Sequence, residues 1–384
     1  MHIKKWEVAP LDRERAAQLA ERCSIPFFLA MLLEIRGFSS EAAVADLLSG
    51  GELGDPFSMK DMDKAVERIQ RALEDFEKIA VYGDYDADGV TATSILYTYL
   101  EAVGADVLYY IPQREGEGYG MNLGAVESLY HQGVSLIITV DNGIASVQEV
   151  ERARELGMDV VITDHHRPQA QIPSAYAVVD AYQPEDQSAF KDLCGAGVAL
   201  KLVMALEGEG APEILEEYAD LAALGTVADV VPVLGENRAI VKAGLRVLTR
   251  GGRAGVDALL EQSGMAGKEL SATSLAFTVI PRLNATGRMG APERAVRLLT
   301  CEGEEEAQAL SAEICEDNDL RKSVESKIAQ EAFAKIEGDP SLRYSRVLVV
   351  SGESWHHGVI GIVASRVMER YGKPCMVISL DGEM

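Results

Sequence analysis

VYGDYDADGVTATS, at residues 81–94, places three aspartates two residues apart, between a β-branched run and a stretch rich in small residues. At this spacing an extended or tightly turned backbone can point two or three of the carboxylates, Asp84, Asp86 and Asp88, at one cation. Apolar and small residues on either side predict a strand before the aspartates and a helix after them. The sequence therefore predicts a cation site at the carboxyl end of a strand.

An EF-hand calcium loop is the obvious alternative, because it also begins D-x-D-x-D-G and has its glycine at the sixth position, here Gly89. That loop needs a bidentate glutamate at position twelve, where this chain has Ile95. Val90 and Ala92 are equally unable to bind calcium. The calcium loop is disfavoured, and the remaining ligands must come from elsewhere in the chain.

The composition is that of an ordinary folded protein of 384 residues. The N-terminus has no apolar leader, and no apolar run approaches the ~18 residues that a membrane helix needs. The five cysteines are odd in number and have no C-x-x-C spacing, which argues against a disulfide framework or a zinc site. We therefore predict a cytoplasmic protein that does not associate with membranes.

The formal charge of -25 excludes general electrostatic coating of nucleic acid, which needs clustered lysine and arginine. Aromatic residues make up only 6% of the chain, so there is little material for base-stacking platforms. Any binding of phosphate must be local. Part of the acidity has a function if a carboxylate cluster holds divalent cations.

Helical periodicity over residues 11–50 and 57–77 gives way, from residue 79, to short β-branched runs that alternate with helical segments. This alternation predicts an α/β fold with a parallel sheet, in which ligands collect beyond the carboxyl ends of the strands. The candidate residues follow the predicted strands at those ends. The runs are IAVYGD, DVLYYIP, SLIITVDNG, DVVITDHH and AYAVVDAY.

The C-terminal part of the chain predicts one long helix and a second, smaller α/β unit. No glycine or proline lies between Gly303 and Gly338, where helix formers dominate. RVLVVSGE, HHGVIGIVASRVMERYGK and PCMVISL then indicate strand, loop with helix, and strand. A unit this short is below the ~50 residues of a small domain, so we expect the chain to be a fragment of a longer protein.

Carboxylates and imidazoles recur at three strand ends, which favours a site for two divalent cations, Mn²⁺ or Mg²⁺. Taken alone, Asp164 or Asp180 would more simply be a turn former or a helix N-cap. Together the residues favour a two-metal phosphoryl-transfer site, with Asp141 as the best bridging ligand. The candidate residues are Asp84, Asp86, Asp88, Asp141, Asp164, His165, His166 and Asp229.

Phosphate capture requires cations within this acidic chain, and arginine suits bidentate contact. Arg282 and Arg288 bracket Asn284 in what we predict to be a glycine-containing loop, and Arg114 is a second candidate. The alternative for each arginine is a surface salt bridge. His356 and His357 precede a helical run whose N-terminus could meet an anion.

A basic stripe, Arg238, Lys242, Arg246 and Arg250, recurs every four residues. A solvated helix face and a track for a DNA backbone are the two interpretations of this stripe.

These motifs resemble those of a known superfamily. GDYDADG, TVDNG, TDHH and TVADVVPV are similar to successive motifs of the DHH phosphoesterases, named for the triplet at 164–166. RLNATGRMG at 282–290 and SWHHGVIGIVASR at 354–366 look like motifs of one branch, the bacterial RecJ single-strand exonucleases. LLEIRGF and LGDPFSMKDMDKAVERI also resemble RecJ. The resemblance covers essentially the whole chain.

The resemblance implies roles for individual residues. Two Mn²⁺ or Mg²⁺ ions would be held by Asp86, Asp88, Asp141, His165 and Asp229, with Asp84 contributing. His166 would contact the scissile phosphate or help protonate the leaving oxygen, so the implied catalytic residues are Asp84, Asp141 and His166. Arg288, Arg282, Asn284, Arg114 and His357 are the expected phosphate-binding residues. Pyrophosphatase-type relatives have a histidine where this chain has Tyr82, so one metal shell must differ.

The resemblance also implies an activity, which is 5′-to-3′ exonuclease hydrolysis of single-stranded DNA to nucleoside 5′-monophosphates in repair and recombination. Partners would be single-stranded DNA and repair or replication proteins, and we expect a monomer. Two rivals remain, a phosphodiesterase for oligonucleotides or cyclic dinucleotides and a non-catalytic replication scaffold.

The expected domains are an N-terminal helical cap region at 1–77, a DHH domain at 78–302, a connecting helix at 303–338 and an incomplete DHHA1 domain at 339–384.

Overall fold

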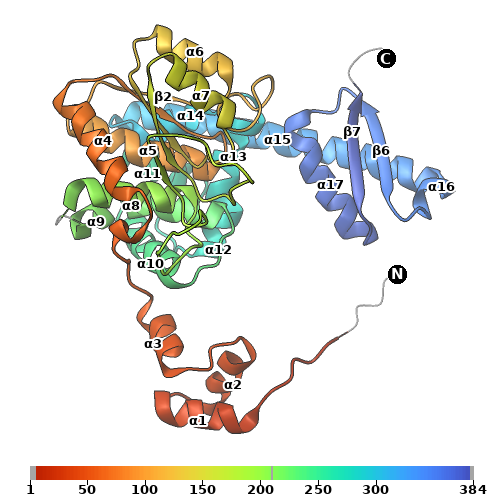
Figure 1. The fold of residues 1–384 in the computed structure, drawn as a ribbon. Helices are drawn as coiled ribbons and strands as arrows, with labels where there is room; N and C mark the ends of the chain where they lie inside the picture. The colour runs from red at the N-terminus through yellow and green to blue at the C-terminus, as the bar shows by residue number, and fades with distance from the viewer. Residues whose placement is uncertain (1–5, 209–210, 381–384) are drawn as a thin grey trace.

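The computed structural model describes residues 6–208 and 211–380, and its centre is a parallel sheet of five strands (Figure 1). The sheet has the order β2-β1-β3-β4-β5, and every neighbouring pair is parallel. All five β-branched runs of the sequence form strands, so the predicted parallel α/β class is confirmed. The strands are β1 (Ile79–Tyr82), β2 (Val107–Tyr110), β3 (Leu136–Val140), β4 (Asp159–Thr163) and β5 (Ala177–Val179).

Helices cover both faces of this sheet, as parallel sheets require. On β1, Ile79 and Val81 face one hydrophobic core while Ala80 and Tyr82 face the other, in the alternation expected of a strand. Three helices lie on the first face: α4 (Met62–Glu74), α5 (Ala87–Ala102) and α8 (Gly195–Glu207). The second face carries α6 (Leu123–His131) and α7 (Val147–Glu155).

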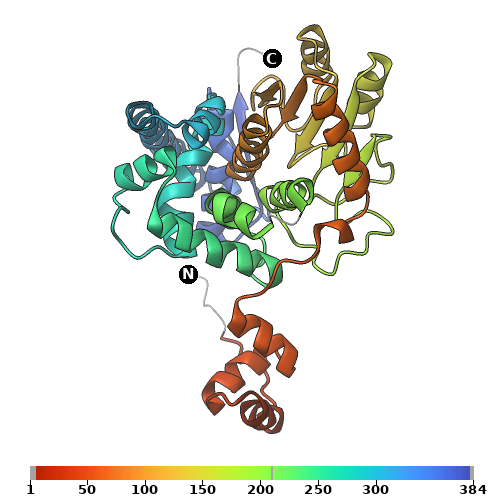
Figure 2. The same cartoon turned by 90° about the vertical axis from the view of Figure 1, so that its left-hand side faces the viewer.

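The N-terminal helices form a small unit that stands apart from the main body (Figures 1 and 2). They are α1 (Arg13–Cys23), α2 (Phe27–Ile35) and α3 (Glu41–Ser49), and they share a core of their own around Leu19 and Leu33. The next helix, α4, differs from this arrangement. Its buried face, with Met62 and Ile69, belongs to the core of the sheet. The predicted cap region, 1–77, therefore includes a helix that packs with the sheet domain.

Two cations of the predicted basic stripe hold the C-terminal end of α3. The stripe lies on α10 (Gly235–Arg250), where Arg238 Nε donates to the carbonyl of Leu47 at 3.0 Å and Lys242 Nζ to that of Ser49 at 2.6 Å. Arg246 and Arg250 lie 3.8 and 3.2 Å from carboxylate oxygens of Glu216. Neither of the two interpretations drawn from the sequence included this contact with the N-terminal segment.

The remaining helices of the main body form a layer against α5, α8 and the long helix α15 (Glu304–Gly338). They are α9 (Ala211–Ala228), α10, α11 (Ala254–Gln262) and α14 (Glu293–Thr300), with the shorter η1 (Pro56–Ser58), α12 (Ala272–Ser274), η3 (Leu275–Val279) and α13 (Ile280–Arg288).

The glycine-containing loop predicted around RLNATGRMG is wrong, because residues 280–288 form helix α13. Gly287 is needed for close packing and not for a turn. A Cβ atom at this position would lie 2.2 Å from the backbone oxygen of Tyr85. The helix therefore rests directly on the 84–88 turn.

The stretch between Gly303 and Gly338 forms one helix, α15 (Glu304–Gly338), of 35 residues and about 50 Å. Three glutamates in its first turn suit the helix dipole. Leu310 and Ile314 are buried in the core of the sheet domain, whereas Ile328 and Ile336 are buried in a separate C-terminal core. The helix thus joins two α/β units, as Figure 1 shows.

The C-terminal unit contains α16 (Pro340–Arg343), β6 (Leu348–Glu353), α17 (His357–Tyr371) and β7 (Cys375–Leu380). Its two strands are parallel, in the predicted strand, loop, helix, strand order. Residues 1–5 and 381–384, at the outer ends of the first and last expected domains, lie outside the described residues.

In the parts of the chain that the structure describes, no single helix is long and apolar enough to cross a membrane. Helices α1 and α2, which meet at a bend of 120°, together have the length and the apolar composition of a broken membrane span. Length and composition are the only support for that interpretation.

Candidate metal centre

The predicted ligands meet at the carboxyl edge of the central strands. Tyr82 at the end of β1 pairs with Thr139 of β3, and Val140 of β3 pairs with Thr163 of β4. Asp84, Asp141 and the 164–166 triplet follow these strand ends at once, so that parallel pairing brings them to one place. Asp229, just past the end of α9, approaches from the helical layer.

Helix N-termini position two of the carboxylates. Asp86 is the N-cap of α5, and its Oδ1 accepts hydrogen bonds from the N–H groups of Asp88 and Gly89 at 2.9 and 3.0 Å. Asp88 accepts from the first turn of α8, where the N–H groups of Gly195 and Ala196 lie 2.6 and 2.9 Å from its two oxygens. The N–H groups at the starts of two helices thus fix the positions of these two carboxylates.

His165 lies among three carboxylates. Its Nε2 is 3.0 Å from Asp141 Oδ1 and 3.9 Å from Asp88 Oδ2, and its Nδ1 is 3.8 Å from Asp229 Oδ2. Three groups of residues offer ligand atoms within 4.8 Å of one another, and Asp141 belongs to two of these groups. The groups are Asp84 with Asp86 and Asp141, Asp88 with His165 and Asp229, and Asp141 with His165 and His166.

Several of these polar atoms are buried without a hydrogen bond. They are Oδ1 of Asp84, and Oδ1 of Asp141 and Nε2 of His165, which lie 3.0 Å apart without the angles of a hydrogen bond. Leaving such atoms unpaired in the interior is costly, and like charges at this distance repel. Carboxylate oxygens and neutral imidazole nitrogens are the donors that Mn²⁺ and Mg²⁺ accept. The residues present therefore fit a pair of divalent cations.

The pKa values of the carboxyl groups reflect this crowding. Burial, followed by the charge of Asp86, raises the pKa of Asp84 to about 7. Burial and the charges of Asp88, Asp86 and Asp84 raise the pKa of Asp141 well above its ordinary range. Burial and then the Asp88 charge raise the pKa of Asp229 to about 6. A bound cation would remove the repulsion that all these groups share.

Asp164, the first residue of the DHH triplet, is satisfied by the protein itself. Its oxygens accept hydrogen bonds from the N–H groups of Ile144, His165 and His166 at 2.7 to 3.1 Å, and Oδ1 lies 2.8 Å from His166 Nδ1. Burial opposes ionisation, but the hydrogen bond and charge of His166 outweigh it and lower the pKa of Asp164. Asp164 therefore orients the two histidines.

The same contact acts on His166. The hydrogen bond that Asp164 accepts raises the pKa of this imidazole, although burial opposes the shift. The second contact of His166 was not predicted from the sequence. The hydroxyl of Tyr119 lies 3.1 Å from His166 Nδ1 and donates to the backbone oxygen of Asp141 at 3.1 Å. Tyr119 lies in a segment with glycines at positions 116, 118 and 120 and no helical or strand periodicity. The sequence therefore gives no signal that this side chain reaches His166.

A cavity of 280 Å³ is lined both by aspartates of the site and by cationic side chains. Arg114 and Arg288 both line it, and Arg114 also lies over the ring of Tyr85, 5.2 Å from its centroid. Burial and then the charges of Arg114 and Arg321 lower the pKa of Arg288. A bound anion would offset the repulsion between these cations. The lining residues are Asp84, Tyr85, Asp86, Ala87, Arg114, Tyr119, Ala228, Asp229, Asn284 and Arg288.

Three of the five residues expected to bind phosphate thus line the cavity, namely Arg114, Asn284 and Arg288. Among the described residues, Arg282 and His357 are not part of this lining. Arg282 Nε donates to Cys315 Sγ at 3.3 Å, and its Nη1 donates to the backbone oxygen of Thr278. His357 is the first residue of α17. Once residues 280–288 are a helix, Arg282 and Arg288 point to different sides.

Tyr82 is not at the metal centre. Its side chain is fully buried in the core on the other face of the sheet, where its hydroxyl donates to the backbone oxygen of Gly120 at 3.2 Å. The position that holds a histidine in pyrophosphatase-type relatives is therefore part of the packing in this chain.

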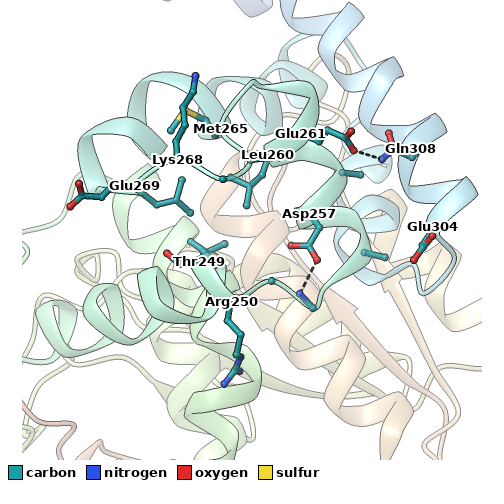
Figure 3. A pocket seen from close by; sticks show the side chains of 18 of the residues that line it. Thr249, Arg250, Asp257, Leu260, Glu261, Met265, Lys268, Glu269, Glu304 and Gln308 are labelled. Carbon is teal, nitrogen blue, oxygen red and sulfur yellow. Dashed lines mark hydrogen bonds between the residues drawn. The ribbon is translucent and has the colours of Figure 1, made fainter.

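A larger cavity of 1110 Å³ lies elsewhere, between the end of α10, α11 and the start of α15 (Figure 3). Its rim includes Arg250, Glu261, Lys268 and Glu304. None of the residues predicted for the metal centre lines it.

Comparison with known proteins agrees with the geometry. Residues 78–226 match the family described as "DHH family, N-terminal domain". The matched residues contain all five strands of the sheet and the aspartates that follow β1, β3 and β4, so the sheet domain is of the DHH class.

Proteins of similar sequence show which family within the DHH class the chain belongs to. The chain is 43% identical to the "Single-stranded-DNA-specific exonuclease RecJ" of Bacillus subtilis, over 99% of this chain and 48% of that protein. It is 36% identical to the Salmonella typhimurium protein of the same name, over 97% and 67%. The chain belongs to the RecJ family. It spans about half the length of the B. subtilis relative.

Two solved structures from Thermus thermophilus share the fold over 97% of this chain. RecJ in complex with Mn²⁺ has a TM-score of 0.83 at 34% identity, and the chain covers 53% of it. RecJ in complex with Mg²⁺ has a TM-score of 0.75 at 32% identity, with 51% covered.

Proposed function

We propose that this chain is the nuclease core of a 5′-to-3′ exonuclease that hydrolyses single-stranded DNA to nucleoside 5′-monophosphates. The observation that carries the proposal is one cavity with two kinds of wall. The carboxylates of Asp84, Asp86 and Asp229 line it together with the guanidinium groups of Arg114 and Arg288, and one buried oxygen of Asp84 has no hydrogen-bond partner. Such a cavity suits a phosphodiester whose anionic oxygens must lie between cations. Membership of the RecJ family supports the substrate.

Two divalent cations, Mn²⁺ or Mg²⁺, would be held by Asp84, Asp86, Asp88, Asp141, His165 and Asp229. When bound, such a pair acts as a Lewis acid on the phosphoryl group and generates a nucleophile from water near neutral pH. Asp141 belongs to two of the ligand groups, which supports a bridging position. The T. thermophilus structures with Mn²⁺ and with Mg²⁺ are consistent with either cation.

His166 is the proposed proton donor or phosphate contact. Asp164 keeps one imidazole nitrogen occupied and raises the pKa of the ring, so His166 holds a proton more readily near neutral pH. The hydroxyl of Tyr119 lies 3.1 Å from the same nitrogen and also restrains the ring. Arg114 and Arg288 would hold the strand by its phosphates, with Asn284 beside them.

Location and partners follow as part of the same proposal. We infer a cytoplasmic monomer that works with repair or replication proteins on DNA in recombination. All five cysteines are free, which is consistent with a reducing compartment.

The test uses single strands labelled at the 5′ or the 3′ end, with Mn²⁺ or with EDTA, on the protein and its Asp141→Ala variant. We expect mononucleotide release from the 5′ label that disappears with EDTA and with the substitution. Activity that survives Asp141→Ala would sink the two-metal assignment. Hydrolysis restricted to very short oligonucleotides or cyclic dinucleotides would establish the rival phosphodiesterase. No hydrolysis with intact cation binding would favour a scaffold.

A further inference from the structure

A close backbone contact joins the C-terminal unit to the wall of the metal cavity. A Cβ atom on Gly358, in the first turn of α17, would lie 2.2 Å from the backbone oxygen of Arg288. The side chain of Arg288 returns the contact, since its Nη1 donates to the backbone oxygen of Gly358 at 3.0 Å. Any side chain at position 358 must therefore push α17 away from α13.

Helix α13 in turn lies on the metal-binding turn. The side-chain oxygen of Asn284 accepts a hydrogen bond from the N–H of Ala87 at 2.9 Å. Gly287 allows the helix backbone to approach the carbonyl of Tyr85. Asn284 and Gly287 are three residues apart, on one face of the helix. The cavity-lining arginine is thus held between the aspartate turn and the C-terminal unit.

The C-terminal unit is itself fixed on α15. Trp355 and Val359 are buried against Ile328 and Ala332 of that helix. The buried carboxylate of Glu325 on α15 lies 2.7 Å from Arg366 Nε on α17 and 2.6 Å from Arg321 Nη1. At the first turn of α17, His356 Nδ1 also lies 3.8 Å from Glu115, the neighbour of Arg114. The first turn of α17 therefore has a defined place beside the cavity.

We propose that Gly358 is a positioning residue for the nuclease reaction. Its missing side chain lets the first turn of α17 rest on the carbonyl of Arg288 and hold that guanidinium in the metal cavity. The proposal rests on the proposed function, and it gives the C-terminal unit a role in placing a phosphate-binding group that belongs to the sheet domain. Gly358 acts only through Arg288 and touches no ligand.

The chain offers a matched control on the same helix. A Cβ atom on Gly361 would meet no atom within 4 Å, so Gly361→Ala adds the same methyl group to α17 without a clash. We expect Gly361→Ala to leave kcat/KM at the wild-type value. Gly358→Ala should lower kcat/KM roughly 10- to 100-fold, since small displacements of positioning groups have effects of that size. Mn²⁺ affinity should stay unchanged in both variants.

A double-mutant cycle separates positioning from a general structural effect. In the Arg288→Ala background, Gly358→Ala should change kcat/KM by less than about 2-fold, because the group that Gly358 positions is gone. An undiminished loss in that background would overturn the proposal. So would a Gly358→Ala variant that is as active as Gly361→Ala.

Amide hydrogen exchange without DNA keeps failure of this inference apart from failure of the proposed function. Faster exchange in α13 and in the first turn of α17 is expected for Gly358→Ala and not for Gly361→Ala. Unchanged exchange would overturn the contact whatever the activity. A wild-type protein that degrades no DNA, yet shows this exchange pattern, would contradict the proposed function alone.

Discussion

Asp141 and Asp164 occupy the same position on neighbouring strands and have opposite electrostatic environments. Each is the first residue after its strand, and they are only 3% and 1% exposed. Asp141 has an oxygen without a hydrogen bond and a strongly raised pKa. Asp164 accepts four hydrogen bonds and has a lowered pKa. A strand-end aspartate can therefore serve as a candidate metal ligand, as Asp141 does, or hold neighbouring groups in place by hydrogen bonds, as Asp164 does.

The largest expected effect is on activity, and it distinguishes Asp141 from Asp164. Asp141→Asn should lower the rate of DNA hydrolysis by on the order of 10³-fold or more, because it weakens a ligand shared by two groups. The free energy of unfolding in EDTA should not fall, since the substitution removes repulsion among buried carboxylates. Single-turnover nuclease assays and urea unfolding check the two parts. An Asp141→Asn variant that is active but unstable would reverse the comparison.

The second effect concerns stability. Asp164→Asn should reduce the free energy of unfolding by about 2–3 kcal/mol in EDTA, because an amide cannot replace all the charge-assisted hydrogen bonds of the buried carboxylate. Urea denaturation at a constant m value measures it, with Asp141→Asn as the matched control. Equal stability of the two variants would show that both aspartates have one role.

The stabilisation by added Mn²⁺ should also differ between the Asp141 and Asp164 variants. Mn²⁺ at 100 times its dissociation constant should stabilise the wild-type protein by about 2.7 kcal/mol per site. Calorimetric melting with and without Mn²⁺ should show this gain in Asp164→Asn, provided that it folds, and a much smaller gain in Asp141→Asn. A full Mn²⁺ response in Asp141→Asn would remove Asp141 from the ligand set.

Asp180 extends the comparison to the next strand, where the expected effect is confined to the pH dependence of stability. It is the first residue after β5, one of its oxygens is buried without a partner, and burial raises its pKa to about 7. Between the unfolded pKa near ~3.9 and the folded value, the native state holds the extra proton, so stability falls as the pH rises, by up to about 1.4 kcal/mol per pH unit.

Above pH 7 this loss is complete. Asp180→Asn should therefore flatten the pH dependence of the unfolding free energy in EDTA between pH 5 and 7. Parallel curves for the variant and the wild-type protein would contradict a raised pKa at this position.

Strand positions and the acidic edge could be predicted from the sequence because both depend on local patterns. Alternating β-branched runs specify the parallel sheet, and the aspartates and histidines of 84–88, 141 and 164–166 follow its strands directly. The two environments of Asp141 and Asp164 could not be predicted. They depend on which N–H groups face each carboxylate, and the N–H of Ile144, which donates to Asp164, comes from another segment of the chain.

The rim of the cavity was harder to predict for a related reason. The glycine at 287 indicated a loop, but it permits contact between α13 and Tyr85, so Arg282 and Arg288 are placed by helical geometry. Tyr119 reaches His166 from a segment without periodicity. Tertiary contact decides each of these positions, and no local pattern records it.

Titration with Mn²⁺, followed by electron paramagnetic resonance, tests the two-metal site most directly, because it counts bound cations without requiring DNA. We expect two Mn²⁺ ions per wild-type chain and loss of at least one in Asp141→Asn. A wild-type chain that binds no Mn²⁺, or an Asp141→Asn variant that binds two as tightly as the wild type, would contradict it.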